Sequence, residues 1–532
     1  MAEYDAVLVG SGINSLACGA LLARAGWRVC VLERNDWLGG AIQTSELTEA
    51  GYLHDVFSAW HPLWVGGAAH AELGAELAAR GLEYLNTDLP TATAFPDGGA
   101  AFLLRNADGN VAELGPEWRD VLDRFQPTAD LAFGLLGTEL WSASGIAFAA
   151  RAVRRLGPAG LAAFAGELLQ SSRDWLEQTF ASQHAHGVLA PWVLHTGLGP
   201  DEASSGFMTQ LIAVAVQEGG MPVPRGGGAK LPDALVRLIR DHGGACETGC
   251  DVEAVLVRSD RAAGVRLANG ETVEAAQAVI ANVTPTQLYE RLLAGVAVPP
   301  AVRAAAARFR YGRPEMQIHF ALSEPARWDG DERLNRTAIV HVTPGLDGVS
   351  RAVNEAQRGL LPEEATIVVG QPLTIDPSRA PEGKGLLWIQ LQELPRRLDW
   401  SDELRERYAD RVQARLARHI PNLESSLLRR VALGPHDLER ANVNLRHGDP
   451  YAGALQLDQN FLWRPLGVSP GHRTPIDRLW QIGASTWPGP GLSGGSGTLV
   501  ARRLLEPTPS RRALGRVRAL VARQHEIESE AR

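Results

Sequence analysis

The sequence has little of what marks a secreted, membrane-spanning or nucleic-acid-binding protein. It has four cysteines in 532 residues. Two of them, Cys246 and Cys250, are spaced C-x3-C, which is not the C-x2-C spacing of a redox pair or a zinc site. No run reaches the roughly 18 uncharged apolar residues that a transmembrane helix needs. The net charge of −9 argues against a nucleic-acid partner.

These absences favour a reduced, cytoplasmic protein. The sequence runs from Met1 directly into an apolar strand, which predicts no signal peptide. At 532 residues the chain is long enough for two interleaved domains with sizeable cores. Its 56 glycines accompany an ordinary apolar content, so they fit turns and phosphate-binding loops rather than disorder. The polar tail, residues 507–532, is assigned no function.

The first 33 residues have the pattern of a dinucleotide-binding strand–helix–strand unit. Residues 6–9 are a short apolar run typical of a buried parallel strand, and residues 29–32 form a second one. Between them, an alanine- and leucine-rich segment from about 13 to 25 predicts a helix. Ser15 takes the place of the third glycine of the fingerprint and is small enough for close packing of helix on strand.

The turn and the acid of this unit carry its chemistry. Gly10 permits the tight turn, and Gly12 lets the backbone approach a pyrophosphate. The first helical turn, which begins at Ile13 and Asn14, directs its amide groups and its dipole at the phosphates. Glu33 ends the second strand, where a carboxylate can bond a ribose hydroxyl. An acid at this position favours FAD or NAD over NADP.

Two further glycine-rich segments favour FAD over NAD. Soon after Glu33 and Arg34 comes the sequence Gly39-Gly40-Ala41. Near the other end, residues 479–483 predict a strand that ends in Gly483, and a glycine-rich turn then leads into a helix at about 498–505. Such a turn can supply main-chain donors to a flavin nucleotide. The candidate donors in it are Gly483, Gly491, Leu492 and Ser493.

The middle of the chain carries no second nucleotide-binding fingerprint. A triple glycine at 226–228 precedes an amphipathic helix at 234–242, but no apolar strand comes before it. An NAD(P)H domain is therefore not expected. The pair Asn269-Gly270 is a strong hairpin-turn signal, and it is followed by an apolar strand at 278–282.

Segments 10–16, 226–232 and 483–494, together with the sequence Gly51-Tyr52-Leu53-His54-Asp55, resemble the phytoene desaturase-like branch of a flavoprotein superfamily that also includes amine oxidases and Rab GDP-dissociation inhibitors. That branch includes carotenoid desaturases and isomerases, retinol saturase and pyridine nucleotide-disulfide oxidoreductase domain-containing protein 2. The resemblance implies bound FAD, with Gly39 and Gly40 against its phosphates and the backbone of Val252 at the adenine edge. After Asp55 the chain departs from the desaturases, which argues against a carotenoid substrate.

We therefore expect an α/β fold with a Rossmann-like FAD-binding domain, in which a parallel sheet carries a βαβ unit and a meander. Residues 1–90, 220–300 and 450–506 would form this domain. Residues 91–219 and 301–449 would form an interleaved substrate domain with a mixed sheet and helices. Residues 117–219 read as helical, and residues 310–321 alternate apolar and polar positions as a half-exposed strand would.

His61 and Trp487 are the candidate catalytic side chains. His61 follows the segment that the resemblance places beside the flavin, and a histidine there could accept a proton as hydride leaves. Trp487 lies in the C-terminal glycine loop and could wall a substrate cavity. For each, a packed core residue is the alternative. His184, His186 and His195 have a spacing unsuited to joint metal binding, so no metal is expected.

The expected activity is removal of hydride from a C–H bond of an apolar or amphipathic small molecule, which forms a double bond. Oxygen, a quinone or another acceptor would reoxidise the flavin. A flavin amine oxidase, a saturase or redox-neutral isomerase, and a non-enzymatic binding protein like the GDP-dissociation inhibitors are the alternatives. Arg151, Arg154 and Arg155 could contact a membrane surface, but a solvated helix face packed on the domain is the favoured interpretation. The oligomeric state is left open.

Overall fold

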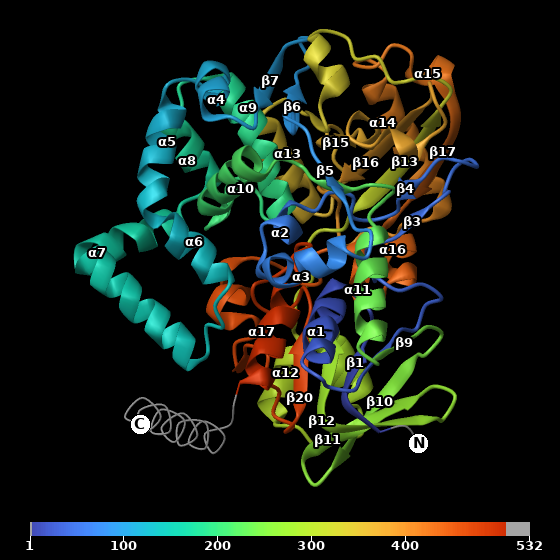
Figure 1. Cartoon of the computed structure of the whole chain (residues 1–532). Coiled ribbons are helices and arrows are strands. Elements are labelled where there is room, and N and C mark those ends of the chain that lie inside the picture. The colour runs from blue at the N-terminus through green and yellow to red at the C-terminus, as the bar shows by residue number, and fades with distance from the viewer. Residues whose placement is uncertain (1–2, 507–532) are drawn as a thin grey trace, which may run out of the picture.

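The computed structural model describes residues 3–506, and two seven-stranded sheets organise this part of the chain. In Figure 1 the first sheet lies in the lower half, beside α1 (Ile13–Arg24), α11 (Lys230–Asp241) and α17 (Gly495–Leu505). The second sheet lies in the upper half, and a group of helices extends to one side. The fold is therefore a mixed α/β architecture, as the sequence predicts.

The first sheet combines a parallel part with an antiparallel meander. Its strands run in the order β10-β11-β12-β1-β2-β9, and β20 also pairs with β12. All pairings are parallel except those within the meander β10-β11-β12. The bounds are β1 (Glu3–Val9), β2 (Val29–Leu32), β9 (Ala245–Glu247), β10 (Val252–Arg258), β11 (Arg261–Leu267), β12 (Thr272–Asn282) and β20 (Leu479–Ile482).

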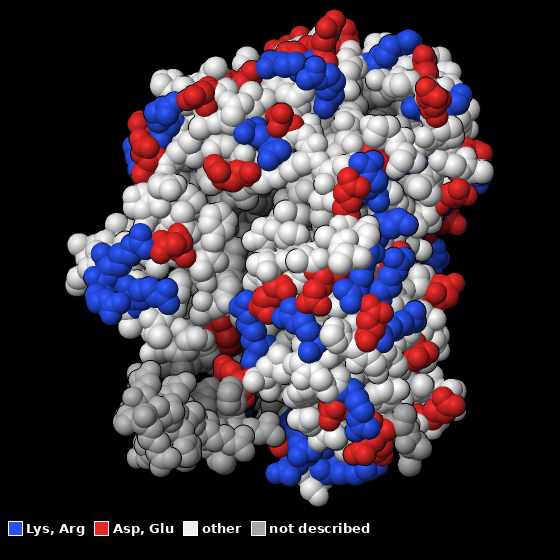
Figure 2. Space-filling view, viewed as in Figure 1, with Lys and Arg blue, Asp and Glu red and all other residues white. Residues whose placement is uncertain are grey.

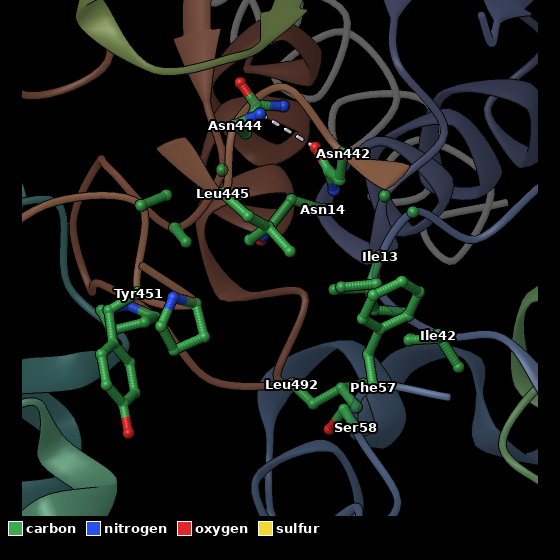
Figure 3. Close-up of a pocket in the computed structure, with 18 of the residues that line it drawn as sticks. Ile13, Asn14, Ile42, Phe57, Ser58, Asn442, Asn444, Leu445, Tyr451 and Leu492 are labelled. Carbon is green, nitrogen blue, oxygen red and sulfur yellow. Dashed lines mark hydrogen bonds between the residues drawn. The ribbon is translucent and has the colours of Figure 1, made fainter. Parts of the chain in front are cut away.

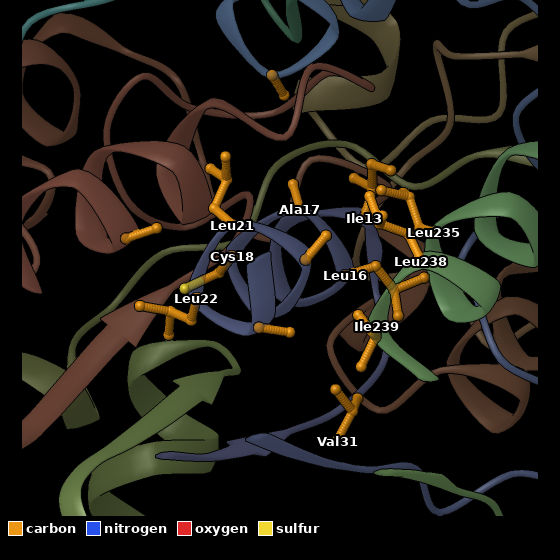
Figure 4. Close-up of a cluster of buried hydrophobic side chains, with 14 of the residues drawn as sticks. Ile13, Leu16, Ala17, Cys18, Leu21, Leu22, Val31, Leu235, Leu238 and Ile239 are labelled. Carbon is orange, nitrogen blue, oxygen red and sulfur yellow. The ribbon is translucent and has the colours of Figure 1, made fainter. Parts of the chain in front are cut away.

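Helix α1 is buried over almost its whole circumference because elements pack on all sides of it. Residues 13 to 23 are all buried, and Figure 4 shows Ile13 and Leu16 close to Leu235 and Ile239 of α11. Val31 of β2 belongs to the same core cluster. A helix that is buried on nearly every side needs cover all round, and the sheet, α11 and α17 provide it.

The second sheet is antiparallel apart from one parallel pair. Its order is β17-β13-β16-β15-β14-β6-β7, and only β14 with β6 is parallel. The bounds are β6 (Thr91–Ala94), β7 (Ala100–Leu103), β13 (Met316–Leu322), β14 (Ile339–Val342), β15 (Ile367–Gly370), β16 (Gly385–Leu391) and β17 (Leu427–Leu433). Helix α14 (Asp402–Leu416) packs on one face through an apolar cluster.

The alternating segment around β13 does not form the half-exposed strand that the sequence pattern predicts. All seven residues of β13 are buried. The apolar positions, such as Ile318, pack in the cluster that includes α14. Of the alternate positions, Gln317 lines an internal cavity instead of facing bulk water. The alternation of apolar and polar residues does give β13 an apolar face and a polar face, but the rest of the fold covers the polar face.

The predicted helical region forms a set of helices beside the second sheet, and α7 projects furthest from the body (Figure 1). Gly157, with φ of 66°, breaks the helical geometry of α7. The bounds are α4 (Ala107–Leu114), α5 (Glu117–Phe125), α6 (Ala129–Leu136), α7 (Ala143–Leu169), α8 (Ser172–Thr179), α9 (Gln183–Leu189) and α10 (Ser205–Gly219). Within residues 3–506, no helix combines the length and apolar character needed to cross a bilayer.

Charges of both signs are mixed over the face seen in Figure 2, and arginines gather over α7. These arginines, Arg151, Arg154 and Arg155, are exposed. The nearby Phe164 is half-buried and meets Phe207 of α10 edge to face, with 6.3 Å between the ring centroids. The apolar side of α7 is thus partly used for packing, and membrane contact by its arginines stays a prediction.

Candidate functional site

A cavity of about 420 Å³ lies between the two sheets and is lined by residues from both. One end is formed by the glycine turn after β1 and by the end of β2. The other reaches the second sheet and α10. Figure 3 shows Ile13, Ile42 and Phe57 on one side of this space and Tyr451 on the other. Chain segments that are far apart in sequence therefore meet around one internal space.

Two glycine turns approach each other at the first end of the cavity. Gly10 has φ of +83°, and its amide donates to the carbonyl of Leu32 at 2.8 Å. A Cβ atom on Gly40 would lie 2.9 Å from the Cα atom of Gly12. Only glycine at position 40 permits this approach, which leaves main-chain amides exposed on the cavity wall as a phosphate-binding turn requires.

Glu33 is held in place at the end of β2 by three donors. Its Oε2 accepts from the amide and the hydroxyl of Ser11 at 2.8 and 2.7 Å, and its Oε1 accepts from the amide of Asn35 at 3.0 Å. The side chain is buried and lines the cavity. Oε1 has one further acceptor position, so the group can also bond a ribose hydroxyl.

Two helix N-termini meet beside the same turn. Gly12 precedes α1 and Gly494 precedes α17, and neither glycine has a side chain that could cap its helix. The helices touch where the amide of Gly497, in the first turn of α17, donates to Oδ1 of Asn14 at 3.3 Å. The amides that remain without a cap and the positive ends of two helix dipoles together favour an anion. The arrangement fits the pyrophosphate of a dinucleotide.

The 51–55 segment and the triple glycine at 226–228 are joined by a buried ionic cluster. Arg379 is fully buried and forms ion pairs with Asp55 and, at 3.2 Å, with Asp376. The carboxylate of Asp55 accepts from the amide of Gly228 at 2.8 Å, and that of Asp376 accepts from the amide of Gly226 at 2.7 Å. These two sequence motifs therefore hold each other in place beside the cavity.

Most of the sequence-predicted cofactor residues are brought together at the cavity. Ser15 and Ser493 are not among its lining residues; Ser15 accepts from the side-chain amide of Asn282 at 3.0 Å, and Ser493 from the amide of Gly495 at 3.1 Å. The predicted residues that line it are Gly10, Gly12, Ile13, Asn14, Glu33, Arg34, Gly39, Gly40, Ala41, Val252, Gly483, Gly491 and Leu492.

The two candidate catalytic side chains do not line the cavity. His61 is fully buried, and its Nδ1 lies 3.0 Å from the hydroxyl of Tyr84. Trp487 is buried as well, and its Nε1 donates to the carbonyl of Thr138 at 2.9 Å. Both rings are turned toward neighbouring protein groups, which corrects the expectation that they face a substrate.

A pair of histidines 146 positions apart, which no local sequence pattern links, reaches the cavity. His195 lines it, and its Nε2 lies 3.2 Å from Nε2 of His341 on β14. The ring of Trp192 lies over His195, with 4.7 Å between centroids. Burial lowers the pKa of His195 to about 4 and that of His341 further, so both rings are neutral at pH 7. The pair can hold one hydrogen between its two facing nitrogens.

Buried histidines should make the protein sensitive to acid. Burial lowers the pKa of His54, His61 and His195 to about 4. An unfolded histidine titrates near pH 6.5, so between about pH 6.5 and 4 the unfolded chain binds more protons at these sites. Stability contributed by these residues is therefore present above pH 6.5 and is lost as the pH falls through 4.

Two buried carboxyls act in the opposite direction. Burial raises the pKa of Glu315 and Glu393 to about 7. Their contribution to the free energy of unfolding is therefore lost as the pH rises through 7. Because the histidines outnumber them, we expect maximal stability near pH 6.5 and a falling midpoint of thermal unfolding toward pH 5. The variant His195→Phe should flatten the acid side of that profile. A midpoint that rises steadily from pH 7 to pH 5 would contradict this prediction.

Comparison with known proteins settles the family. The model of the family described as "Flavin containing amine oxidoreductase" matches residues 16–492. The chain belongs to this family. Among curated relatives, the protein of Rattus norvegicus named pyridine nucleotide-disulfide oxidoreductase domain-containing protein 2 is 25% identical. The match spans 94% of this chain and 93% of the rat protein. A lycopene-forming phytoene desaturase of Pseudescherichia vulneris is also 25% identical, over 92% of this chain and 96% of its own.

Solved structures agree on the fold of this flavin containing amine oxidoreductase family member. Wild-type putrescine oxidase bound to putrescine superimposes with a TM-score of 0.61 at 15% identity, and covers 94% of this chain and 98% of that one. The protein is an FAD-dependent oxidoreductase with the fold of the FAD amine oxidases. The close glycine turns, Glu33 and the two uncapped helix starts fit that cofactor.

Proposed function

We propose that this oxidoreductase removes hydride from a C–H bond of an amphipathic small molecule and a proton from the neighbouring atom, which leaves a double bond. The observation that carries the proposal is the continuity of the cavity. It runs from the glycine turn and Glu33 to a largely apolar end. The side chains at that end include Trp60, Trp192, Ile212, Val216, Met221 and Ile339. A relative named as a phytoene desaturase supports a reaction that forms carbon–carbon double bonds.

In this proposal the residues of the βαβ unit and the C-terminal glycine loop hold FAD. Gly10, Gly12 and the first turn of α1 would hold the pyrophosphate, Glu33 the ribose and Val252 the adenine edge. When bound, the cofactor supplies an acceptor for two electrons and a hydrogen, which oxygen, a quinone or another oxidant would later take up.

We assign the proton-accepting role to His195, which lines the cavity; because burial lowers its pKa to about 4, it would act as a weak base. In the tautomer that carries a hydrogen on Nε2 and donates it to His341, the Nδ1 lone pair of His195 is free to accept a proton. The partner ring would then share the added charge. The rings of Trp60 and Trp192 also line this part of the cavity, and an indole offers no acceptor for a proton.

Amine oxidation is the second candidate, since the family name points to it. The sequence contains two lysines, Lys230 and Lys384, and neither lines the cavity. A lysine beside the flavin, which amine oxidases usually have, is therefore missing from this cavity. This observation favours a substrate without an amine, either dehydrogenated by hydride removal from a C–H bond or, in the opposite direction, reduced at a double bond as by a saturase.

The test is anaerobic reduction of the FAD-loaded protein by a panel of cyclic hydrocarbons, alcohols and amines. We expect alcohols or hydrocarbons to bleach the visible flavin bands, with a product two hydrogens lighter by mass spectrometry. Admission of air or a quinone then identifies the acceptor by the rate at which the bands return. Bleaching by amines alone would replace the proposal with an amine oxidase, and a protein that takes up no FAD would favour a binding protein.

A further inference from the structure

The inner strands of the second sheet present a polar face to the cavity. Gln317 on β13 stands directly opposite Gln390 on β16. Glu315 and Gln392 follow on the same faces, because side chains alternate along a strand. All four line the cavity. The opposite faces of the two strands carry only apolar side chains, among them Ile318 and Ile389, which pack in the core with α14.

This polar face is covered by protein and not by bulk water. Glu315, Gln317 and Gln392 are each 2 to 3% exposed. Nε2 of Gln390 donates to Oε1 of Glu315 at 2.5 Å, and Nε2 of Gln392 lies 2.8 Å from the hydroxyl of Tyr451. The face is therefore an ordered set of polar groups inside the protein. Burying an apolar sheet face would have cost less free energy.

Two acceptors in this array lack a donor. Among residues 3–506, Oε1 of Gln317 and Oε1 of Gln392 are buried without a hydrogen-bond partner. Leaving a buried acceptor unpaired is unfavourable, so these oxygens mark a place where a ligand completes the hydrogen bonding. The three amides are neutral and carry donors as well as acceptors. Such a set matches a group that both donates and accepts a hydrogen bond.

We propose that Glu315, Gln317, Gln390 and Gln392 form a polar subsite that binds a hydroxyl group of the substrate. The proposal rests on the proposed function and narrows it, because it makes the substrate an alcohol with an apolar body rather than a pure hydrocarbon. The hydroxyl donates to a glutamine Oε1 and accepts from an amide N–H. The apolar body of the alcohol occupies the end of the cavity lined by Trp60. The ligand is thus amphipathic, like the cavity that holds it.

A neutral hydroxyl fits this subsite better than an ammonium group. Besides Glu315, the charged or titratable groups around the polar face are Asp449, Tyr451 and Arg313. Asp449 already accepts three backbone amides at 2.7 to 2.8 Å, and burial raises its pKa. Burial also raises the pKa of Glu315 to about 7. An array of amides beside a partly protonated carboxyl provides less negative charge than a cation requires.

The test compares three probes of one shape on FAD-loaded protein without turnover: methylcyclohexane, cyclohexylmethanol and cyclohexylmethylamine. Binding is followed by quenching of tryptophan fluorescence and by calorimetry. We expect the alcohol to bind about tenfold more tightly than the hydrocarbon, the gain typical of one completed buried hydrogen bond. Equal binding of alcohol and hydrocarbon, no binding of the alcohol, or tighter binding of the amine would each overturn the proposal.

Gln317→Met is the sharpest variant, because methionine keeps the length of the side chain. Nε2 of Gln317 donates to the carbonyl of Phe57, and that carbonyl keeps a second donor, Nε1 of Trp388 at 3.1 Å. We expect the preference for the alcohol to disappear while hydrocarbon binding and FAD retention are unchanged. Loss of FAD with the preference intact would assign the polar face to the cofactor and overturn the proposal.

The matched control is Gln357→Met on the exposed surface of α13 (Leu346–Gln357), which should leave all three affinities unchanged. Gln392→Met provides a second variant if Gln317→Met does not fold, since the hydroxyl of Tyr451 still donates to the carbonyl of Leu194 at 2.9 Å. These measurements need no catalysis. Failure of the subsite is therefore distinct from failure of the proposed reaction, which only product analysis reveals.

Discussion

Replacing Arg379 with methionine is expected to destabilise the protein by about 3–5 kcal/mol, the usual cost of removing one partner from a buried ionic cluster. The guanidinium is fully buried between Asp55 and Asp376, and it also donates to the carbonyl of Pro224 at 3.1 Å. The variant would leave two carboxylates in the interior without their cation. Urea unfolding monitored by circular dichroism measures the change in the free energy of unfolding.

Two controls separate this cluster from ordinary surface pairing. Arg225→Met removes an exposed ion pair with Glu83, whose side chains are 51% and 57% exposed, and should change stability little. The double variant Asp55→Asn/Arg379→Met should cost less than the sum of its single variants, because the charges act as one unit. Full additivity, or an Arg379→Met protein as stable as the wild type, would refute the role given to the cluster.

Gly497→Ala is expected to separate the starts of α1 and α17, which meet beside the proposed FAD end of the cavity. A Cβ atom at position 497 would lie 1.8 Å from the carbonyl oxygen of Asn14, so α1 and α17 must move apart. Overpacking of this kind typically costs about 1–3 kcal/mol. Because the same contact positions the uncapped amides, we also expect at least a tenfold loss of FAD affinity, measured by absorbance after gel filtration.

Gly166→Ala in α7 is the matched control. That glycine is also helical, but an added Cβ there would meet no atom within 4 Å. Alanine is the better helix former by about 1 kcal/mol, so this variant should keep its FAD and be slightly more stable. Equal FAD retention by both variants would show that the helix crossing does not control cofactor binding.

Local sequence signals predicted the cofactor end of the molecule well. The predicted strand at 29–32 coincides with β2, and the predicted helix at 13–25 coincides with α1 to within one residue. The expected turn at Asn269-Gly270 does lie between β11 and β12. These elements depend on neighbours within a few residues, on hydrophobic spacing and on glycine. Such information is present in a short window of the chain.

The substrate end was less accessible from sequence, because its residues meet only through tertiary packing. His195 and His341 are 146 positions apart, and no local pattern links them. The alternation around Gln317 indicated a strand with a polar face, but it did not reveal that the face lines a cavity. His61 stands close to the predicted segment, yet its ring turns to Tyr84, since side-chain direction is not encoded in spacing alone.

The pairing of β20 with β12 has a consequence for how the protein is made. Ile482 lies beside Asn282 in the first sheet. Along the sequence, however, strands β13 to β17 of the second sheet lie between these two residues. A ribosome releases the N-terminal strands long before the C-terminal one, and closure over so long a loop is entropically costly. The first sheet is therefore completed only after residues 479–482 have been synthesised and have paired with β12, and we expect flavin insertion to follow that pairing.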